Sequence, residues 1–431
     1  MSGGRAASLP GRPAAGSAEG PAAHASLRPG MRTAAFVDLD VLARNFRAVA
    51  EAAGPGREVM AVVKAEAYGH GSLEAARAFR RAGARWFGVA AVEEAEALRS
   101  LEAEGGEGGL RGARILLMSG VLPECAPRIV SLGLDAVVWD MAQAEALSAA
   151  AQAIGRRTPI HLKVDSGMGR LGVASAEAAD FLRNVSGLRG VEAAGLMSHL
   201  SRADEEGGQE ATRRQFEVVR SVEEELRGKG LLPPLIHCAN SAGGLLFPEA
   251  PGGLVRAGIA LYGCPLGPAR SAPVELAVTW KGAVLQVKGV AAGEPVGYGG
   301  IYRRKTAGRI AVVAVGYADG YPRLLSNRGE AILRGRRVPV AGRVSMDMLT
   351  LDVTGLEGVR MGEEAILLGS EGGESIPAGE LASRAETIPY EILCGISLRV
   401  PRVYMRGGRC VGVRALQGRT AGGAAFEEGD R

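Results

Sequence analysis

The sequence contains few cysteines, and none of them has a partner at the spacing of a metal site or a redox pair. Cys125, Cys238, Cys264, Cys394 and Cys410 are scattered over the 431 residues, and no two of them form a C-x-x-C motif. An odd and unspaced set of cysteines argues against a disulfide framework and against a structural zinc site. We therefore expect no metal, and reduced thiols of the kind that are typical of a cytoplasmic protein.

Long apolar runs and clustered charge are also absent. No run approaches the ~18 consecutive apolar residues of a transmembrane helix, so we expect no association with a membrane. The formal net charge is only +4, from 51 Lys and Arg against 47 Asp and Glu, which is too small to indicate nucleic-acid binding. Apolar residues make up 47% of the chain, which is enough for the cores of two domains of ordinary size.

The two ends of the chain differ in composition from the rest. The first thirty residues include eight Ala, six Gly and four Pro, without the apolar segment of a signal peptide. The last residues are similarly small and polar. This composition predicts a disordered tail over residues 1–31 and a flexible tail over residues 417–431.

Short apolar runs alternate with stretches of helical period over residues 32–268. Ser72 is expected to cap a helix that ends near Gly83, and residues 205–228 are expected to form a longer amphipathic helix. Eight apolar runs have the length of buried parallel strands: Met60–Val63, Trp86–Ala90, Ile115–Met118, Ala136–Trp139, Ile160–Val164, Ala193–Met197, Leu235–Cys238 and Leu254–Ile259. Eight strand–helix repeats predict an α/β fold, a (β/α)8 barrel of the TIM type. An open doubly wound sheet is the alternative, and both folds place chemistry at the carboxyl ends of their strands.

Beyond residue 268 the pattern changes to strands separated by glycine-rich turns. A short helical stretch is expected near residues 380–385. The strand-like segments are Val278–Val290, Arg309–Val315, Ala331–Val340, Leu349–Val353 and Glu364–Leu368. This order predicts a mostly β C-terminal domain over residues 269–416.

Polar side chains of unusual kinds follow several of the predicted barrel strands. Lys64 ends the first strand, and a lysine that closes a buried strand loses hydration, which lowers its pKa as a Schiff-base amine requires. Lys163 ends the fifth strand and Arg170 follows it, while His199 follows the sixth strand. For each residue alone, a structural role is the alternative, such as a lysine at the rim or a hydrogen-bonded core histidine.

The seventh and eighth strands lead into loops that contain hydrogen-bond donors. Asn240 and Ser241 precede Ala-Gly-Gly, and Arg256 lies just before Gly258 and Ile259. These are the loops in which barrels commonly hold a phosphate. A strand-end lysine, phosphate donors and an interior arginine together favour pyridoxal 5'-phosphate as the cofactor, bound to the lysine as an aldimine.

Four predicted loops outside the barrel core carry aromatic or sulfur side chains that are unusual for ordinary turns. Tyr298 lies in Val-Gly-Tyr-Gly-Gly, and Tyr317 lies in Gly-Tyr-Ala-Asp-Gly-Tyr-Pro-Arg. Met346 precedes Asp347 in a third loop, and Tyr390 precedes a glutamate in a fourth. A tight turn with a packed tyrosine is the structural alternative for each of these loops.

Taken together, these motifs resemble those of bacterial alanine racemases. They occur in that family's order from about residue 33 to residue 413: Ala61–Gly71, Lys163–Gly172, His237–Ala242, Val255–Gly263, Val296–Gly299, Val315–Arg323, Val344–Met348 and Tyr390–Tyr404. The resemblance implies a cytoplasmic, pyridoxal-phosphate-dependent isomerase that acts on alanine and supplies D-alanine for peptidoglycan. It also implies a head-to-tail homodimer, in which each subunit contributes to the active site of its partner.

The resemblance implies a role for each candidate site residue. Lys64 would carry the cofactor and exchange the α-proton on one face of the substrate, and Tyr298 would act on the other face. The implied cofactor-binding residues are Lys64, Tyr68, His199, Asn240, Ser241, Arg256, Gly258, Ile259 and Tyr390. Arg170, Met346 and Tyr317 would contact the substrate, and Lys163 matches a position that is carbamylated in some members.

The chain departs from the family pattern at two positions near the candidate site. Glu66 replaces the usual Asn or Asp and could alter the charge around the cofactor, and Ser198 replaces the usual Thr. Three other functions stay open: a racemase of broader specificity, a decarboxylase built on a similar barrel and β domain, and a non-catalytic pyridoxal phosphate carrier. Carriers of that kind lack the β domain, so a β domain with Tyr298 argues against this alternative.

Overall fold

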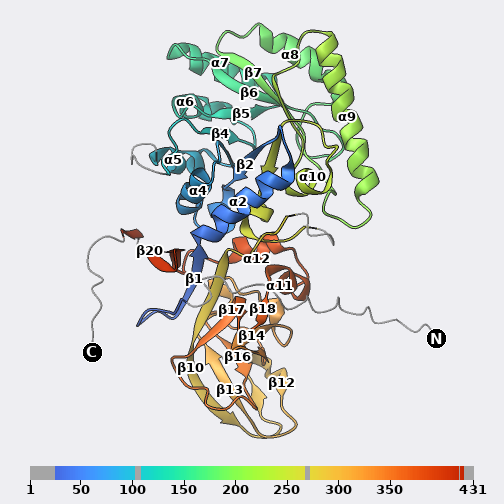
Figure 1. Cartoon of the computed structure of the whole chain (residues 1–431). Helices are drawn as coiled ribbons and strands as arrows, with labels where there is room; N and C mark the ends of the chain where they lie inside the picture. The colour runs from blue at the N-terminus through green and yellow to red at the C-terminus, as the bar shows by residue number, and fades with distance from the viewer. Residues whose placement is uncertain (1–24, 102–107, 267–271, 417, 422–431) are drawn as a thin grey trace, which may run out of the picture.

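The computed structural model describes residues 25–101, 108–266, 272–416 and 418–421 (Figure 1). Most of the two predicted tails therefore lies outside the described residues. Residues 25–31 contact the second domain, where Lys281 Nζ donates to the Ala25 carbonyl at 2.6 Å and the Leu27 amide donates to Glu364 Oε1 at 2.6 Å. Residues 418–421 form a strand, so both stretches that composition assigned to tails include ordered backbone contacts.

The first sheet is a parallel barrel of eight strands. The strands are β2 (Glu58–Val62), β3 (Trp86–Val89), β4 (Arg114–Leu117), β5 (Asp135–Val138), β6 (Thr158–Lys163), β7 (Val191–Met197), β8 (Leu235–His237) and β9 (Leu254–Ala257). Each of them overlaps one of the eight predicted runs. The last strand, β9, pairs with the first, β2, and a bridge between Asn240 and Arg256 joins the end of β8 to β9. This closure confirms the (β/α)8 barrel and excludes the open doubly wound sheet.

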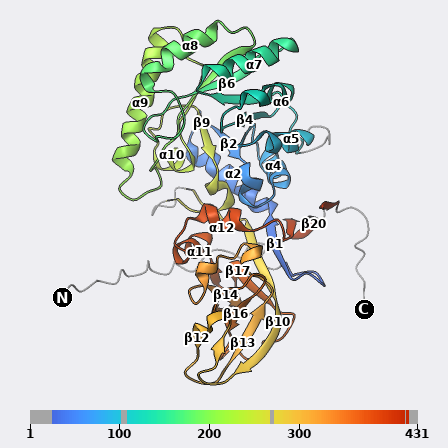
Figure 2. The same cartoon turned by 180° about the vertical axis from the view of Figure 1, so that it is seen from behind.

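Helices surround the barrel, as Figures 1 and 2 show from opposite sides. They are α2 (Leu39–Ala53), α4 (Ser72–Arg81), α5 (Val92–Ser100), α6 (Ala126–Ser131), α7 (Met141–Ala153), α8 (Ala178–Ser186), α9 (Gln209–Gly228) and α10 (Ser241–Leu246).

Two details of the helices predicted from the sequence are wrong. Helix α9 begins four residues later than expected, and Ser72 is not the cap of α4, because Gly71 holds that position. The carboxylate of Glu66 instead accepts the Ser72 amide hydrogen at 3.3 Å.

The second domain is mostly β, as predicted. Its strands are β10 (Val278–Val290), β11 (Pro295–Val296), β12 (Tyr302–Arg303), β13 (Gly308–Val313), β14 (Glu330–Leu333), β15 (Arg336–Pro339), β16 (Leu349–Asp352), β17 (Glu364–Glu371), β18 (Glu374–Ile376), β19 (Arg402–Arg406), β20 (Arg409–Ala415) and β21 (Gly418–Ala421). The segment predicted as one strand over Ala331–Val340 is a hairpin, β14 and β15, that turns at Arg334 and Gly335. Helices α11 (Ala378–Arg384) and α12 (Pro389–Gly395) lie between the barrel and this sheet in both views.

The first strand of the chain, β1 (Thr33–Asp38), belongs to the second sheet although it precedes the barrel in sequence. It pairs antiparallel with β10 and parallel with β19, and all six of its residues are buried. From residue 25 onward, the chain therefore starts in the second domain, passes through α2 into the barrel, and returns after β9. Within the described residues, no helix is long and apolar enough to cross a membrane.

Candidate active site

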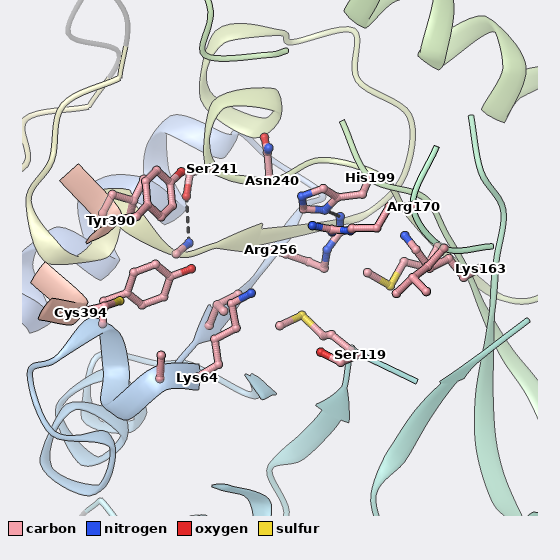
Figure 3. A pocket seen from close by; sticks show the side chains of 18 residues that line it. Lys64, Ser119, Lys163, Arg170, His199, Asn240, Ser241, Arg256, Tyr390 and Cys394 are labelled. Carbon is pink, nitrogen blue, oxygen red and sulfur yellow. Dashed lines mark hydrogen bonds between the residues drawn. The ribbon is translucent and has the colours of Figure 1, made fainter. Parts of the chain in front are cut away.

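A cavity of about 490 Å³ opens at the carboxyl ends of the barrel strands (Figure 3). This volume is within the ~300–1,000 Å³ range of small-molecule sites. The cavity brings together eleven of the residues expected from the sequence: Lys64, Tyr68, Lys163, Arg170, His199, Asn240, Ser241, Arg256, Gly258, Ile259 and Tyr390. Figure 3 shows Ser241 and Tyr390 on one side, and Lys163 and Arg170 on the other, with Arg256 between them.

The backbone that follows Lys64 has an uncommon conformation. The next four residues, Ala65 to Tyr68, all have φ between 51° and 55°, although none of them is glycine. Left-handed backbone costs about 1–2 kcal/mol for each such residue, so the surrounding structure must hold it in place. The buried His70 ring does so from inside, because its Nδ1 lies 3.1 Å from the Ala67 carbonyl oxygen and 3.0 Å from that of Tyr68.

Glu66 holds the same turn from the outside. Its carboxylate forms a two-pronged ion pair with Arg414 of β20, in which the Arg414 Nη2 to Glu66 Oε1 distance is 3.1 Å. Burial would raise the pKa of the Glu66 carboxyl, but the Arg414 guanidinium, the Ser72 amide and the charge of Arg402 together outweigh this effect, and the pKa is lowered. The negative charge of Glu66 is therefore paired with an arginine of the second domain.

Lys64 is a half-buried amine at the centre of the cavity wall. Burial lowers its pKa, and the positive charge of Arg170 lowers it further, while the carboxylate of Glu94 acts in the opposite direction. The direction is the one expected from the position of Lys64 at a strand end. An amine of this kind is more readily unprotonated near neutral pH, which is the form that reacts with an aldehyde.

Arg256 of β9 is 3% exposed and extends into the barrel interior. Its Nη1 donates to the His237 carbonyl at 2.8 Å, and its Nη2 donates to the Ser198 carbonyl at 2.8 Å and to the Cys238 carbonyl at 3.1 Å. Nη2 also lies 3.0 Å from His199 Nδ1. These bonds engage only the two terminal nitrogens, so within the described residues Nε is the guanidinium donor that stays available to the cavity.

Burial is the main influence on the protonation state of His199, and positively charged neighbours act in the same direction. Burial, and then the charges of Arg256 and Lys163, lower the pKa of His199 to about 2. The imidazole is therefore neutral at physiological pH, and its Nδ1 accepts a hydrogen bond from Arg256. Burial and the same arginine also lower the pKa of Lys163, which is 4% exposed, to about 8.

Polar groups gather at the opposite end of the cavity. The Gly258 amide donates to Ser241 Oγ at 2.8 Å, and Asn240 Oδ1 accepts the Gly243 amide hydrogen at 2.9 Å at the start of α10. A Cβ at Gly258 would lie 2.3 Å from Tyr68 Oη, so the close approach of this phenol requires glycine. The expected phosphate donors are thus brought together by the loops after β8 and β9.

Three of the expected site residues do not line this cavity. Tyr298, Tyr317 and Met346 belong to the second domain, with side chains that are 73%, 42% and 52% exposed. The loops of Tyr317 and Met346 lie side by side, because the Tyr317 amide donates to the Ser345 carbonyl at 3.0 Å and the Ala318 amide donates to the Met346 carbonyl at 2.9 Å. Within one chain, the structure therefore presents two separate groups of candidate residues.

Several residues that line the cavity were not among the candidates expected from the sequence. Ser119 follows β4, and Cys394 of α12 lies close enough to Lys64 for their charges to interact. Ser119 directly follows the predicted strand Ile115–Met118, so the rule that polar residues after barrel strands line the site could have found it. Nothing in the local sequence shows that Cys394 would reach the barrel, because α12 is brought there by the packing of the two domains.

Two family models match this chain. The alanine racemase N-terminal domain matches residues 37–265, and the alanine racemase C-terminal domain matches residues 277–404. The alanine racemase of Symbiobacterium thermophilum is 45% identical over 378 residues, which cover 87% of this chain and 98% of that protein. The family resemblance found in the sequence is thereby confirmed.

Two solved structures are similar over most of the chain. The alanine racemase of Bacillus anthracis with bound L-Ala-P is 32% identical, with a TM-score of 0.80, and covers 90% of this chain and 98% of its own. The alanine racemase of Bartonella henselae with covalently bound pyridoxal phosphate is 30% identical, with a TM-score of 0.76, and covers 87% of this chain and 100% of its own. By its sequence and its two domains, this chain belongs to the alanine racemase family of pyridoxal-phosphate-dependent isomerases.

Proposed function

We propose that this chain interconverts L-alanine and D-alanine with pyridoxal 5'-phosphate and two proton-transferring groups, Lys64 and Tyr298. The observation that carries the proposal is the cavity, in which an amine of lowered pKa, a buried arginine and a cluster of polar donors converge. The membership of the chain in the alanine racemase family supports the choice of substrate.

The chemistry of the cavity fits pyridoxal phosphate. The phosphate would be held by Ser241, by the phenols of Tyr68 and Tyr390, and by the backbone at Gly258 and Ile259. Asn240 would hold the start of α10 beside it. Arg256 would face the ring nitrogen through Nε, and a permanent cation there keeps that nitrogen unprotonated.

Racemisation requires removal of the α-proton from one face and delivery of a proton to the other. Pyridoxal phosphate, when bound, supplies an aldehyde for the amino group and a ring that withdraws electrons from Cα. Lys64 Nζ would accept or return the proton on one face, since its lowered pKa favours the neutral amine. Tyr298 Oη would do the same on the opposite face, and His199 would accept a hydrogen bond from Arg256 and help to keep this arginine in place.

The exposure of Tyr298 is the reason to include a second copy of the chain. A phenol on a largely exposed turn, outside the cavity of its own chain, can act only if it enters another cavity. We therefore propose a head-to-tail homodimer in which Tyr298, Tyr317 and Met346 complete the cavity of the partner. An interface of this kind between two identical chains gives two equivalent active sites.

The alanine carboxylate would be bound by Arg170 of the cavity and by the Met346 backbone from the second copy, with Tyr317 at the entrance. Lys163 is a candidate for carbamylation. Its pKa of about 8 leaves part of the amine unprotonated, and a carbamate would add a negative charge beside Arg170. We further propose that the protein acts in the cytoplasm and supplies D-alanine for peptidoglycan.

Incubation of the cofactor-loaded protein with L-alanine in deuterated water tests the proposal. Loss of the α-proton NMR signal together with D-alanine on a chiral column is the expected result. Exchange without inversion would leave Lys64 active and contradict the role of Tyr298. Bound cofactor without any exchange would favour a pyridoxal phosphate carrier instead.

A further inference from the structure

Four polar side chains form a continuous row through the barrel interior, where TIM-type barrels usually hold layers of branched apolar residues. Arg256 Nη1 lies 3.2 Å from His237 Nδ1, and His237 Nε2 lies 2.8 Å from His161 Nδ1. His161 Nε2 lies 3.0 Å from Asp135 Oδ2. Both histidines are fully buried, and Arg114 pairs with Asp135 at the amino-terminal end of the barrel.

Several residues around the row make space for it. A Cβ at Gly195 of β7 would lie 2.2 Å from His161 Nδ1, so this ring occupies space that only glycine leaves free. The Trp86 ring meets the His161 ring edge-on, with centroids 6.0 Å apart, and the Arg114 guanidinium lies over Trp86 at 4.1 Å. The row is therefore packed on its sides as well as bonded end to end.

The hydrogen bonds of the row can run in only one direction. An arginine only donates, so His237 Nδ1 must accept from Arg256 and carries no proton. A neutral His237 then has its proton on Nε2 and donates it to His161 Nδ1, and His161 in turn donates from Nε2 to the carboxylate of Asp135. The reverse tautomer of His237 would place two N–H groups against each other.

We propose that Asp135, His161 and His237 are positioning residues for the racemase reaction, which fix the orientation of Arg256 through this one-way row of hydrogen bonds. The inference rests on the proposed function, in which Arg256 faces the cofactor. A carboxylate at one end fixes both tautomers, and the fixed acceptor at His237 holds Nη1. The His237 carbonyl on Nη1 and the three acceptors around Nη2 lie outside the row, and the fixed acceptor at His237 Nδ1 completes this set, so that the guanidinium plane, and with it the direction of Nε, has one orientation.

His161 offers a matched pair of variants. In H161Q the amide oxygen can accept from His237 and the amide nitrogen can donate to Asp135, so the direction of the row is kept. In H161L both bonds are lost, and the tautomer of His237 is no longer fixed from that side. The comparison of H161Q with H161L therefore separates the effect of the hydrogen bonds and their direction from the effect of filling the space at this position.

The first measurement uses the protein without cofactor, labelled with 15N in histidine and arginine. We expect His161 and His237 both to carry their proton on Nε2 in the wild type. The Arg256 Nε–H resonance, assigned with R256K, is expected to shift in H161L and to stay close to its wild-type position in H161Q. A proton on Nδ1 of either histidine, or an Arg256 signal that is the same in all three proteins, would overturn the inference.

The second measurement uses the cofactor-loaded enzyme. We expect kcat for alanine to fall by about tenfold or more in H161L, with KM changed by less than about twofold, and to be largely restored in H161Q. The absorption band of the bound cofactor is expected to move in H161L only. Equal kcat values in H161L and the wild type would refute the positioning role. Absence of racemisation by the wild type would refute the proposed function and leave the NMR result to decide the row.

Discussion

Mixing two inactive variants of this chain tests whether each active site is built from two copies. Lys64→Ala removes the amine from the cavity, and Tyr298→Phe removes the phenol hydroxyl from an exposed turn that does not line that cavity. If a site combines Lys64 of one copy with Tyr298 of the other, a mixed dimer has one site with both groups and one site with neither.

The expected magnitude follows from counting these sites. Random reassociation of equal amounts of the two variants makes about half of the dimers mixed, and each mixed dimer has one intact site of two, so about 25% of the wild-type activity per chain returns. Each variant alone stays inactive. The assay is D-alanine formation after the two purified variants have been dissociated under mild conditions, mixed and reassociated.

A mixture of the double variant K64A/Y298F with the wild type serves as the control. With shared sites, every mixed dimer is inactive, and only the wild-type homodimers, about a quarter of all dimers at a 1:1 ratio, are active. The expected activity per total chain is therefore about a quarter of that of the wild type alone. If each site lay within a single chain, this control mixture would keep about half of the wild-type activity per total chain. The mixture of K64A with Y298F would then recover no activity. That pair of results would refute the shared-site reasoning.

Two further predictions concern the cavity and the buried histidines. G258A is expected to weaken binding of pyridoxal phosphate by about tenfold or more, because its Cβ would lie 2.3 Å from Tyr68 Oη. Cofactor titration followed by absorbance measures the change, and G253A, whose Cβ has no neighbour nearer than 3.8 Å, is the matched control that is expected to bind normally. His70 and His199 have their pKa lowered from 6.5 to about 4 and about 2, mainly by burial. Below pH 6.5 the unfolded chain takes up protons that the native protein excludes, so the free energy of unfolding falls by about 2 kcal/mol per histidine from pH 7 to pH 5. Urea unfolding at the two pH values measures this loss, and an equal loss in H70N would contradict the assignment.

The barrel was predictable because most residues of its strands are apolar, without the polar alternation of a half-exposed strand, which is typical of parallel strands covered on both faces. The strand partners of β1 could not be predicted from the sequence, since an equally apolar segment can pair in either of the two sheets. Only tertiary packing decides which sheet it joins. The hairpin of β14 and β15 was also missed. Gly335 is the second residue of its turn, but the first, Arg334, adopts a positive φ without being the glycine, asparagine or aspartate that would signal this conformation.

The cavity residues were predictable because a closed barrel brings the ends of its strands together, whichever helices connect them. His161 and His237 were missed, although a signal exists: His161 is two residues before Lys163 on β6, so both point to the same side of the strand. The spatial separation of Tyr298 from Lys64 could not be predicted from motifs, because a motif does not tell whether its partner belongs to the same chain.

The position of β1 between β10 and β19 has a consequence for synthesis on the ribosome. Ala35 pairs with Arg402, which is translated about 370 residues later, or roughly 20–70 s at ~5–20 residues per second. The barrel has all of its strands well before that time and can close first, while an apolar strand at the start of the chain waits with unpaired backbone groups. Strand β10 can cover one edge of β1 about 250 residues after β1 is made. We therefore expect chaperone binding to nascent chains to concentrate at Thr33–Asp38, to weaken when β10 emerges and to end when β19 has left the ribosome.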